Sequence, residues 1–497
     1  MVTGYLDNYY ARLGVSREAT PEEIRASYHQ AARRLHPDTN SDPAATELFL
    51  QVQEAYETLS NETKRSEYDK TLPLDAVSPP DIMTNAIYSR NVLPVIGTSQ
   101  LVYVLLDLMA LPDPNDRLNA KSPPLNICIV LDTSTSMSGS RLDAVKETAG
   151  HLIQALKPED ILSIVGFNDR PEVIVPATRG LDIKKVEAKI TQLAARGGTE
   201  IFKGLQEGLK QVTKNISPSY ISHLILITDG RTYGDEEACL QLANEASERG
   251  ITISGLGIGH EWNDKFLDEI AKRTGGSSAF ASHPHSIREF LKTKFGQMNT
   301  TFANNVTLEF TTDPNVELRY AFRLSPDAAS ILGTANLHMG EIPLGQSLTV
   351  LMEFIVHSVP QDIKTMILCK GQLNMSIPTR AIPKVNNKFS LSRPTAVNPE
   401  VEPPPQVLVK AMSRLSLYRL QEQAHKDMEN GDVDKAAKRL NNLATQLLHS
   451  GEAGLANTVM LELGVLERGD ILDEESKKQI KYGTRALVFP SGKGPIP

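Results

Sequence analysis

The sequence is poor in cysteine and tryptophan and has no long uninterrupted hydrophobic run. Its 497 residues include three cysteines and one tryptophan. Cys128, Cys239 and Cys369 lie far apart and show no zinc-ligand spacing, which argues against a zinc module and against a disulfide framework. The most apolar stretch, residues 92–111, is interrupted by proline, glycine and a charged residue, so we expect strands there and no membrane span.

The N-terminus and the charge exclude further classes of protein. The first residues, Met-Val-Thr-Gly-Tyr-Leu-Asp, contain no basic region followed by an apolar core, so we expect no signal peptide. A formal net charge of −8 argues against generic nucleic-acid binding. We therefore expect a cytoplasmic protein without a membrane or nucleic-acid partner. No Walker phosphate loop and no Gly-x-Ser-x-Gly elbow is found, so we expect no enzyme activity.

What the sequence does contain near its start is His36-Pro37-Asp38, placed between two segments of helical periodicity. The first segment begins with Thr20-Pro21-Glu22-Glu23, a capping box that predicts a helix start. That helix should end before the proline of the tripeptide, and a second helix is expected from about residue 46. Two antiparallel helices with a polar tripeptide at their tip form a binding finger, and no nucleophile lies nearby.

Residues 5–70 resemble the J domain of DnaJ-type co-chaperones, because Asp7–Val15 and Lys64–Asp69 flank this finger as they do in that family. The resemblance implies a DnaK-type ATPase chaperone as partner. It implies that the following residues bind the chaperone: His36, Pro37, Asp38, Arg25, Tyr28, Arg33 and Arg34. Ala26, His29 and Gln30 stand where the family often has Lys or Arg, so we expect weaker electrostatic steering.

A second pattern starts at Leu125, where buried apolar runs begin to alternate with amphipathic segments. This alternation predicts a doubly wound α/β sheet, which binds ligands at the carboxyl ends of its strands. Polar residues gather at those ends in three groups: Asp132-Thr133-Ser134-Thr135-Ser136, Gly197-Gly198-Thr199, and Thr228-Asp229-Gly230.

These three groups resemble the metal-ion-dependent adhesion site of the von Willebrand factor A fold, over about residues 123–298. The resemblance implies that Ser134, Ser136 and Thr199 touch a metal, and that Asp132 and Asp229 bind it directly or through water. Carboxylates and hydroxyls are hard oxygen donors, which suits Mg²⁺ or Mn²⁺. Hydroxyl ligands leave the metal electrophilic, so an open position could take a carboxylate from a partner protein. A von Willebrand A fold with an empty site is the alternative.

The remaining segments complete a multidomain prediction. Strand patterns in residues 83–122 and 299–382 predict a β-sandwich into which the α/β domain, residues 123–298, is inserted; two independent β pieces are the alternative. The other predicted divisions are an all-α J domain over 1–70, linkers over 71–82 and 383–405, an α-helical region over 406–475 and a disordered tail over 476–497.

Three functions are compatible with this organisation. The leading one is a cytoplasmic J-domain co-chaperone and adaptor that stimulates a DnaK-type ATPase and recruits a client or assembly through the Mg²⁺ site. The alternative is a metal-dependent protein-binding scaffold, for example a partner of a AAA+ ATPase, in which the J domain is only a weak tether. Metal-dependent hydrolysis is the third.

Overall fold

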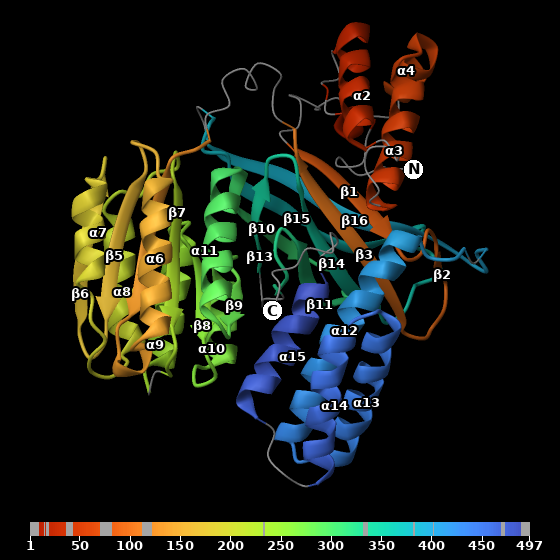
Figure 1. Cartoon of the computed structure of the whole chain (residues 1–497). Coiled ribbons are helices and arrows are strands. Elements are labelled where there is room, and N and C mark those ends of the chain that lie inside the picture. Colours follow the sequence, from red (N-terminus) through yellow and green to blue (C-terminus); the bar gives the residue numbers. More distant parts are fainter. Residues whose placement is uncertain are drawn as a thin grey trace.

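The computed structural model describes residues 9–13, 15, 19–35, 43–69, 82–111, 122–231, 234–331, 336–380, 383–400, 402–468 and 473–488. Figure 1 shows four units: N-terminal helices at the top, an α/β domain on the left, a β-sandwich in the middle and C-terminal helices at the bottom. The predicted fold class is thereby confirmed. Among the described residues, no helix combines the length and the apolar character needed to cross a bilayer.

Two five-stranded sheets form the β-sandwich, in the orders β1-β3-β14-β11-β12 and β13-β10-β15-β16-β2. The strands before the α/β domain are β1 (Ile82–Tyr88), β2 (Leu93–Pro94) and β3 (Gln100–Ala110). The strands after it are β10 (Thr301–Thr311), β11 (Val316–Ser325), β12 (Ala329–Ser330), β13 (Asn336–Pro343), β14 (Ser347–Val356), β15 (Thr365–Ser376) and β16 (Lys384–Ala396). Because β3 pairs with β14 and β2 pairs with β16, both segments build one sandwich. The predicted insertion is confirmed, and the alternative of two independent β pieces is wrong.

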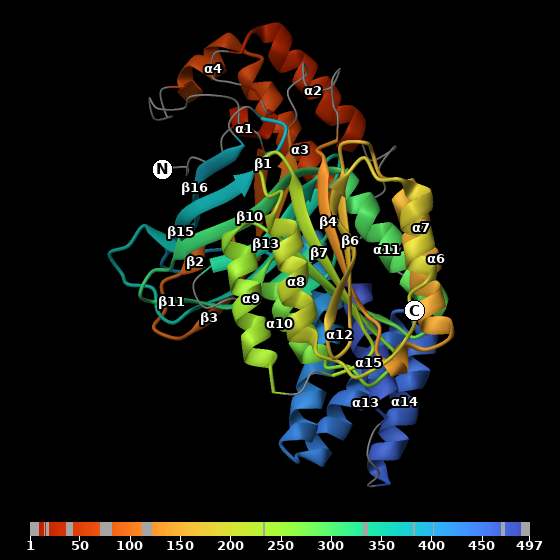
Figure 2. The same cartoon turned by 90° about the vertical axis from the view of Figure 1, so that its left-hand side faces the viewer.

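The α/β domain contains a six-stranded sheet of order β6-β5-β4-β7-β8-β9, parallel except for the edge strand β6. Its strands are β4 (Leu125–Asp132), β5 (Ile161–Phe167), β6 (Pro171–Arg179), β7 (Ile221–Thr228), β8 (Thr252–Ile258) and β9 (Ser278–Ala281). Its helices are α6 (Ser140–Gln154), α7 (Ile183–Thr191), α8 (Ile201–Thr213), α9 (Glu236–Glu248), α10 (Asp264–Arg273) and α11 (Pro284–Asn299), with the short 3₁₀ helix η1 (Thr135–Met137) after β4. Helices cover both faces of the sheet (Figure 2), which explains why β4 is apolar at nearly every position.

The N-terminal helices are α1 (Tyr9–Leu13), α2 (Pro21–Leu35), α3 (Pro43–Leu59) and α4 (Glu62–Asp69). The predicted capping box begins α2, because the Glu23 amide donates to Thr20 Oγ1 at 3.2 Å and the Thr20 amide donates to Glu23 Oε2 at 2.8 Å. Helix α2 packs on α3 through the stacked rings of Tyr28 and Tyr56, whose centroids are 4.1 Å apart.

These helices also pack against the sandwich. Tyr10 and Leu13 of α1 share one buried apolar cluster with Met83 of β1 and Met109 of β3. Burying a large apolar side chain is worth about 1.5–3 kcal/mol. The N-terminal unit is therefore attached to the sandwich by a common core as well as by the chain that connects them.

A buried arginine joins the α/β domain to the sandwich. Arg323 of β11 donates to the carbonyls of Gly275 at 2.7 Å and Gly276 at 2.8 Å, just after α10, and pairs with Asp327 at 2.5 Å. Lys294 of α11 contacts the same carboxylate. Burial alone would raise the pKa of Asp327, but Arg323 and Lys294 outweigh it and hold the pKa well below its usual value. The two units are thus joined by hydrogen bonds from the buried Arg323 and by the ion pair between Lys294 and Asp327.

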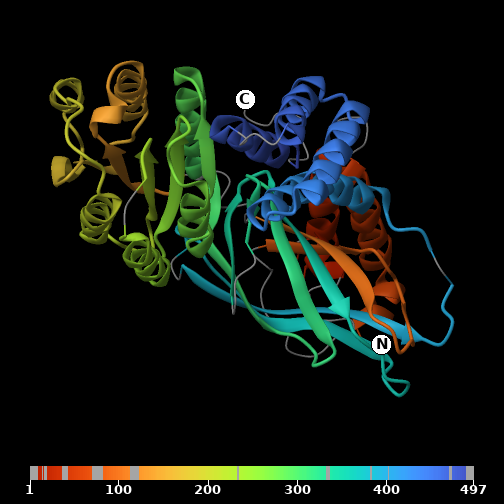
Figure 3. The ribbon, with the colours of Figure 1, turned by 90° about the horizontal axis from the view of Figure 1, so that it is seen from below.

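The C-terminal helices are α12 (Gln406–Glu429), α13 (Val433–His449), α14 (Ala453–Glu467) and α15 (Glu474–Leu487). Two predictions were wrong here. The supposed linker 383–405 contains β16, which pairs with β15 although its buried apolar side chains are few. The supposed disordered tail 476–497 contains most of α15, whose buried residues include Lys478 and Arg485. Figure 3 shows α15, in dark blue, between the α/β domain and the other C-terminal helices. Lys478 and Arg485 hydrogen-bond to the α/β domain there, and Ile480 packs in the apolar cluster of the C-terminal helices.

Candidate functional site

The residues predicted as metal ligands meet at the carboxyl ends of β4 and β7. Asp132 is the last residue of β4, Asp229 directly follows β7, and these two strands are parallel neighbours. Ser136 Oγ donates to Asp229 Oδ1 at 2.7 Å, and the hydroxyl oxygens of Ser134 and Ser136 are 3.0 Å apart. Parallel strands end at one edge of their sheet, which is why residues so distant in the sequence form one cluster.

Asp132 is held rigidly within the fold. Its Oδ1 accepts from the Ser134 amide at 2.8 Å, and its Oδ2 accepts from Thr228 Oγ1 at 2.7 Å. Burial raises the pKa of Asp132 to about 6, although the hydrogen bonds from Ser134 and Thr228 lower it, and the nearby Asp229 raises it further. A carboxylate that is buried beside a second carboxylate is stabilised by a cation.

Thr199 comes to the same edge through a glycine turn. Gly197 has φ of +75°, and its carbonyl accepts from the Thr135 amide at 3.1 Å. Thr199 lies against Gly230, where an added Cβ would be 2.9 Å from Thr199 Oγ1. The turn at Gly197 and the lack of a side chain at Gly230 thus allow the Thr199 hydroxyl to lie next to the residue that follows Asp229.

Sequence reasoning missed one residue of this site. Arg141, in the first turn of α6, pairs with Asp229: its Nη1 is 2.7 Å from Oδ2 of that carboxylate. The Asp229 side chain is fully buried and that of Arg141 is 35% exposed. The only available signal was a basic residue five positions after Ser136, and nothing in the sequence indicates that it turns toward β7.

The donor set fits a hard divalent cation. Asp132, Asp229 and the hydroxyls of Ser134 and Ser136 lie together, and the Thr199 hydroxyl lies beside Gly230; all are oxygen donors, which favours Mg²⁺ or Mn²⁺ over a soft metal. Among the residues that the structure describes, no group of three or more His, Cys, Asp or Glu side chains is placed to hold a metal.

The predicted chaperone-binding residues are only partly described. Arg25 and Arg33 are exposed on α2, whereas Tyr28 is half-buried in the contact with α3. Arg34 belongs to α2, but its side chain is outside the described part. The tripeptide of His36, Pro37 and Asp38 lies outside the described residues altogether.

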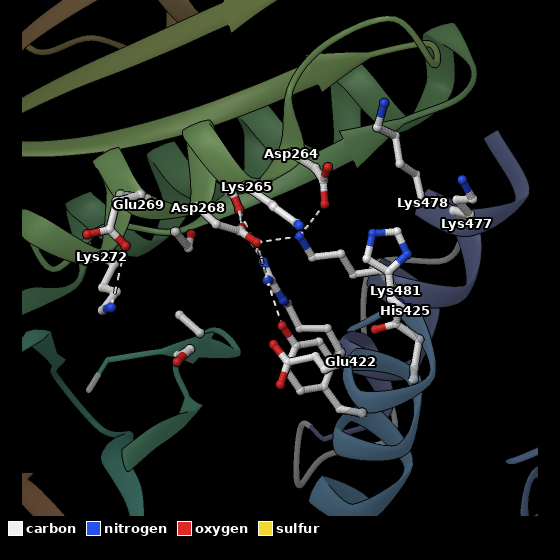
Figure 4. A pocket seen from close by; sticks show the side chains of 18 of the residues that line it. Asp264, Lys265, Asp268, Glu269, Lys272, Glu422, His425, Lys477, Lys478 and Lys481 are labelled. Atoms are coloured by element: carbon white, nitrogen blue, oxygen red, sulfur yellow. Dashed lines mark hydrogen bonds and ion pairs between the residues drawn. The ribbon is translucent and has the colours of Figure 1, made fainter. Parts of the chain in front are cut away.

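A cavity of about 400 Å³ lies between α10, α12 and α15 (Figure 4). Charged side chains dominate its wall and pair with one another: Asp268 contacts both Arg485 and Lys481, and Lys481 also contacts Asp264. Burial alone would raise the pKa of Asp268, but the two cations outweigh it and hold the pKa well below its usual value. These pairs join the C-terminal helices to the α/β domain.

Comparisons with known proteins agree with this division of the chain. A family model of the DnaJ domain matches residues 8–69, one of the von Willebrand factor type A domain matches 126–304, and one described as the Sll0103-like, C-terminal alpha-helical domain matches 406–490.

Individual proteins match different parts of the chain. The uncharacterized protein sll0103 of Synechocystis sp. is 26% identical over 386 residues, which cover 74% of this chain and 89% of that protein. The chaperone protein DnaJ of Streptococcus mutans is 46% identical over 68 residues, 14% of this chain and 18% of that protein, so only a small part of DnaJ is represented.

Among solved structures, a von Willebrand factor type A protein from Catenulispora acidiphila has a TM-score of 0.64 at 16% identity, covering 82% of this chain and 96% of that one. This likeness shows the fold alone. Together the matches and the geometry establish the domain composition: the chain contains an N-terminal J domain, a von Willebrand factor A domain inserted in a β-sandwich, and a C-terminal helical domain of the Sll0103-like kind.

Proposed function

We propose that this protein is a J-domain co-chaperone and adaptor. Its J domain stimulates ATP hydrolysis by a DnaK-type chaperone, and its von Willebrand A domain recruits a client or assembly through a Mg²⁺-dependent docking site. The observation that carries the proposal is the presence, in one chain, of a J domain and of a cluster of oxygen donors at the β4–β7 edge. Both units pack on the same sandwich, so a docked client stays attached to the chaperone-binding helices.

The chemistry of the cluster favours docking. When bound, Mg²⁺ or Mn²⁺ would supply an electrophilic centre for a carboxylate of a partner protein. Asp132 and Asp229 would hold the ion, and Ser134, Ser136 and Thr199 would complete its shell on the protein side. Asp132 is oriented by two hydrogen bonds, one to each of its oxygens, and each oxygen keeps a further lone pair for the ion, so we assign it a binding role.

A second candidate function rests on helix α2. Its exposed face carries Arg25 and Arg33 but also Ala26 and His29, so it has less positive charge than the resemblance leads us to expect. Weak steering toward an acidic chaperone surface would leave the metal site as the principal interaction. In that case the protein is a metal-dependent scaffold, for example for a AAA+ ATPase, and the J domain is a weak tether.

One experiment separates the two functions. Steady-state ATP hydrolysis by a DnaK-type chaperone from the same source is measured with Mg²⁺ and with the intact protein, its His36→Gln variant or its Asp132→Ala variant. The co-chaperone function predicts stimulation that only His36→Gln removes. If the intact protein gives no stimulation, the co-chaperone function is wrong and the scaffold function takes its place.

A further inference from the structure

We infer that Arg141 is a built-in cation that competes with the divalent metal for Asp229 and thereby sets the metal affinity of the site. This inference rests on the proposed metal docking and goes beyond it, because it names the residue that controls when the site is loaded.

Both oxygens of Asp229 are already engaged by the protein. Arg141 Nη1 lies 2.7 Å from Oδ2, and Ser136 Oγ donates to Oδ1 at 2.7 Å. The Asp229 side chain is fully buried, so the guanidinium is the cation that offsets its charge in the absence of a metal. A metal at this edge must share the carboxylate with Arg141 or displace it.

Neighbouring residues leave space for the Arg141 side chain and hold it in position. Gly259, in the turn after β8, has φ of +69°, and an added Cβ there would lie 2.9 Å from Arg141 Nη2. The absence of a side chain at position 259 therefore leaves room for the guanidinium. Arg141 Nη1 also donates to the Ser136 carbonyl at 3.4 Å, which keeps it beside the motif. The fold thus holds the Arg141 side chain in a defined position. Because that side chain is 35% exposed, it can also move out into solvent.

The charge balance gives the direction of the effect. Asp132 and Asp229 contribute two negative charges, and Arg141 cancels one of them. A divalent cation and a guanidinium that share one carboxylate repel each other, and because Asp229 is buried, screening is weaker than in water, so the repulsion should correspond to about tenfold or more in affinity. Removing the arginine should therefore strengthen metal binding and, at the same time, weaken the metal-free protein, since Asp229 is then buried without a cation.

The test uses the full chain and its Arg141→Gln variant, freed of metal with EDTA and titrated with MgCl₂ or MnCl₂ by calorimetry. Melting temperatures are measured in EDTA and in Mg²⁺. The matched control is Arg288→Gln, which removes an exposed arginine that pairs with Glu147 of the same helix α6 at 2.9 Å. We expect the Arg141→Gln variant to bind Mg²⁺ at least about tenfold more tightly than the unmodified protein, to melt at a lower temperature in EDTA and to regain stability in Mg²⁺. The control should behave as the unmodified protein in both measurements.

An unchanged or weaker affinity in Arg141→Gln overturns the inference while leaving metal docking intact. If neither protein binds Mg²⁺ or Mn²⁺, the docking site itself is wrong and the inference fails with it. Should Arg141→Gln fold too poorly to titrate, Arg141→Met, which keeps the apolar stem of the side chain, is used under the same criterion.

Discussion

Arg485 and Asp268 form a two-pronged ion pair across the boundary between the helical domain and the von Willebrand A domain. Arg485 Nη1 donates to Oδ1 at 2.9 Å and Nη2 donates to Oδ2 at 2.8 Å. Nη2 also donates to the Tyr418 hydroxyl at 3.1 Å, so the same guanidinium contacts α10 and α12. Paired N–H donors on one carboxylate are among the stronger polar contacts in proteins, and here they connect three helices.

Replacing Arg485 by alanine should therefore be costly. It leaves the partly buried Asp268 with Lys481 and the Ser278 hydroxyl, and we expect the free energy of unfolding to fall by about 2–3 kcal/mol. Urea denaturation followed by circular dichroism measures this. Arg196→Ala is the control, because its pair with Glu172 is exposed on both sides and should be worth at most about 1 kcal/mol. Equal losses in the two variants would refute a special role for the Arg485 pair.

Stability should fall in acid because of Asp268 and Asp327. Cations hold the pKa of each below its usual value in the folded protein. A depressed folded pKa contributes stability above the unfolded pKa, which is about 3.9, and that stability is lost as the pH falls below it. Melting temperatures measured from pH 7 to pH 3 should therefore drop most steeply below about pH 4. Asp268→Asn should flatten this slope, and an unchanged slope would contradict the assignment.

Magnesium should raise the melting temperature of the unmodified protein and have no effect on Asp132→Asn. Asparagine can keep the hydrogen bonds to the Ser134 amide and the Thr228 hydroxyl, so the metal-free variant should stay folded. It loses the charge that a cation needs. Differential scanning fluorimetry with MgCl₂ against EDTA measures the difference, and a variant that still responds to Mg²⁺ would show that Asp132 is dispensable.

Replacing Met83 and Met109 by alanine should weaken the packing of the J domain against the sandwich. Both methionines lie in the cluster shared with α1, and replacing each by alanine should cost about 2 kcal/mol or more. We expect faster amide hydrogen exchange in α1 and unchanged exchange in α8 of the von Willebrand A domain. Met460→Ala, at an exposed position of α14, should leave both unchanged. If α1 exchanges at the same rate in the double variant, the shared core does not hold the J domain.

Most of the fold could be predicted from short local motifs and from the spacing of apolar residues along the sequence. The capping box at Thr20 depends on four consecutive residues, and the run that ends at Asp132 is apolar because helices cover both faces of its sheet. The five proposed ligands could be grouped because parallel strands end at one edge. In each case the physical cause lies within a short stretch of chain or in a general property of parallel sheets.

The missed features depend on partners that are distant in the sequence. Arg141 pairs with Asp229, and only the fold brings α6 and β7 together. Helix α15 buries Lys478 and Arg485, which lie in the segment that was predicted to be a disordered tail. These charges find their partners in the von Willebrand A domain, and no local periodicity reveals that.

The insertion of one domain into another also sets the order in which this chain can fold. Strand β3 pairs with β14, and Thr349 Oγ1 donates to Asp107 Oδ1 at 2.5 Å across 242 positions of sequence. During synthesis, the apolar strands β1 and β3 leave the ribosome long before β14 exists to cover them. Pairing over such a separation is slow, and unpaired apolar strands aggregate readily. The J domain is made before these two strands and shares an apolar core with them, so during synthesis the unfinished sandwich lies beside the helices of the J domain.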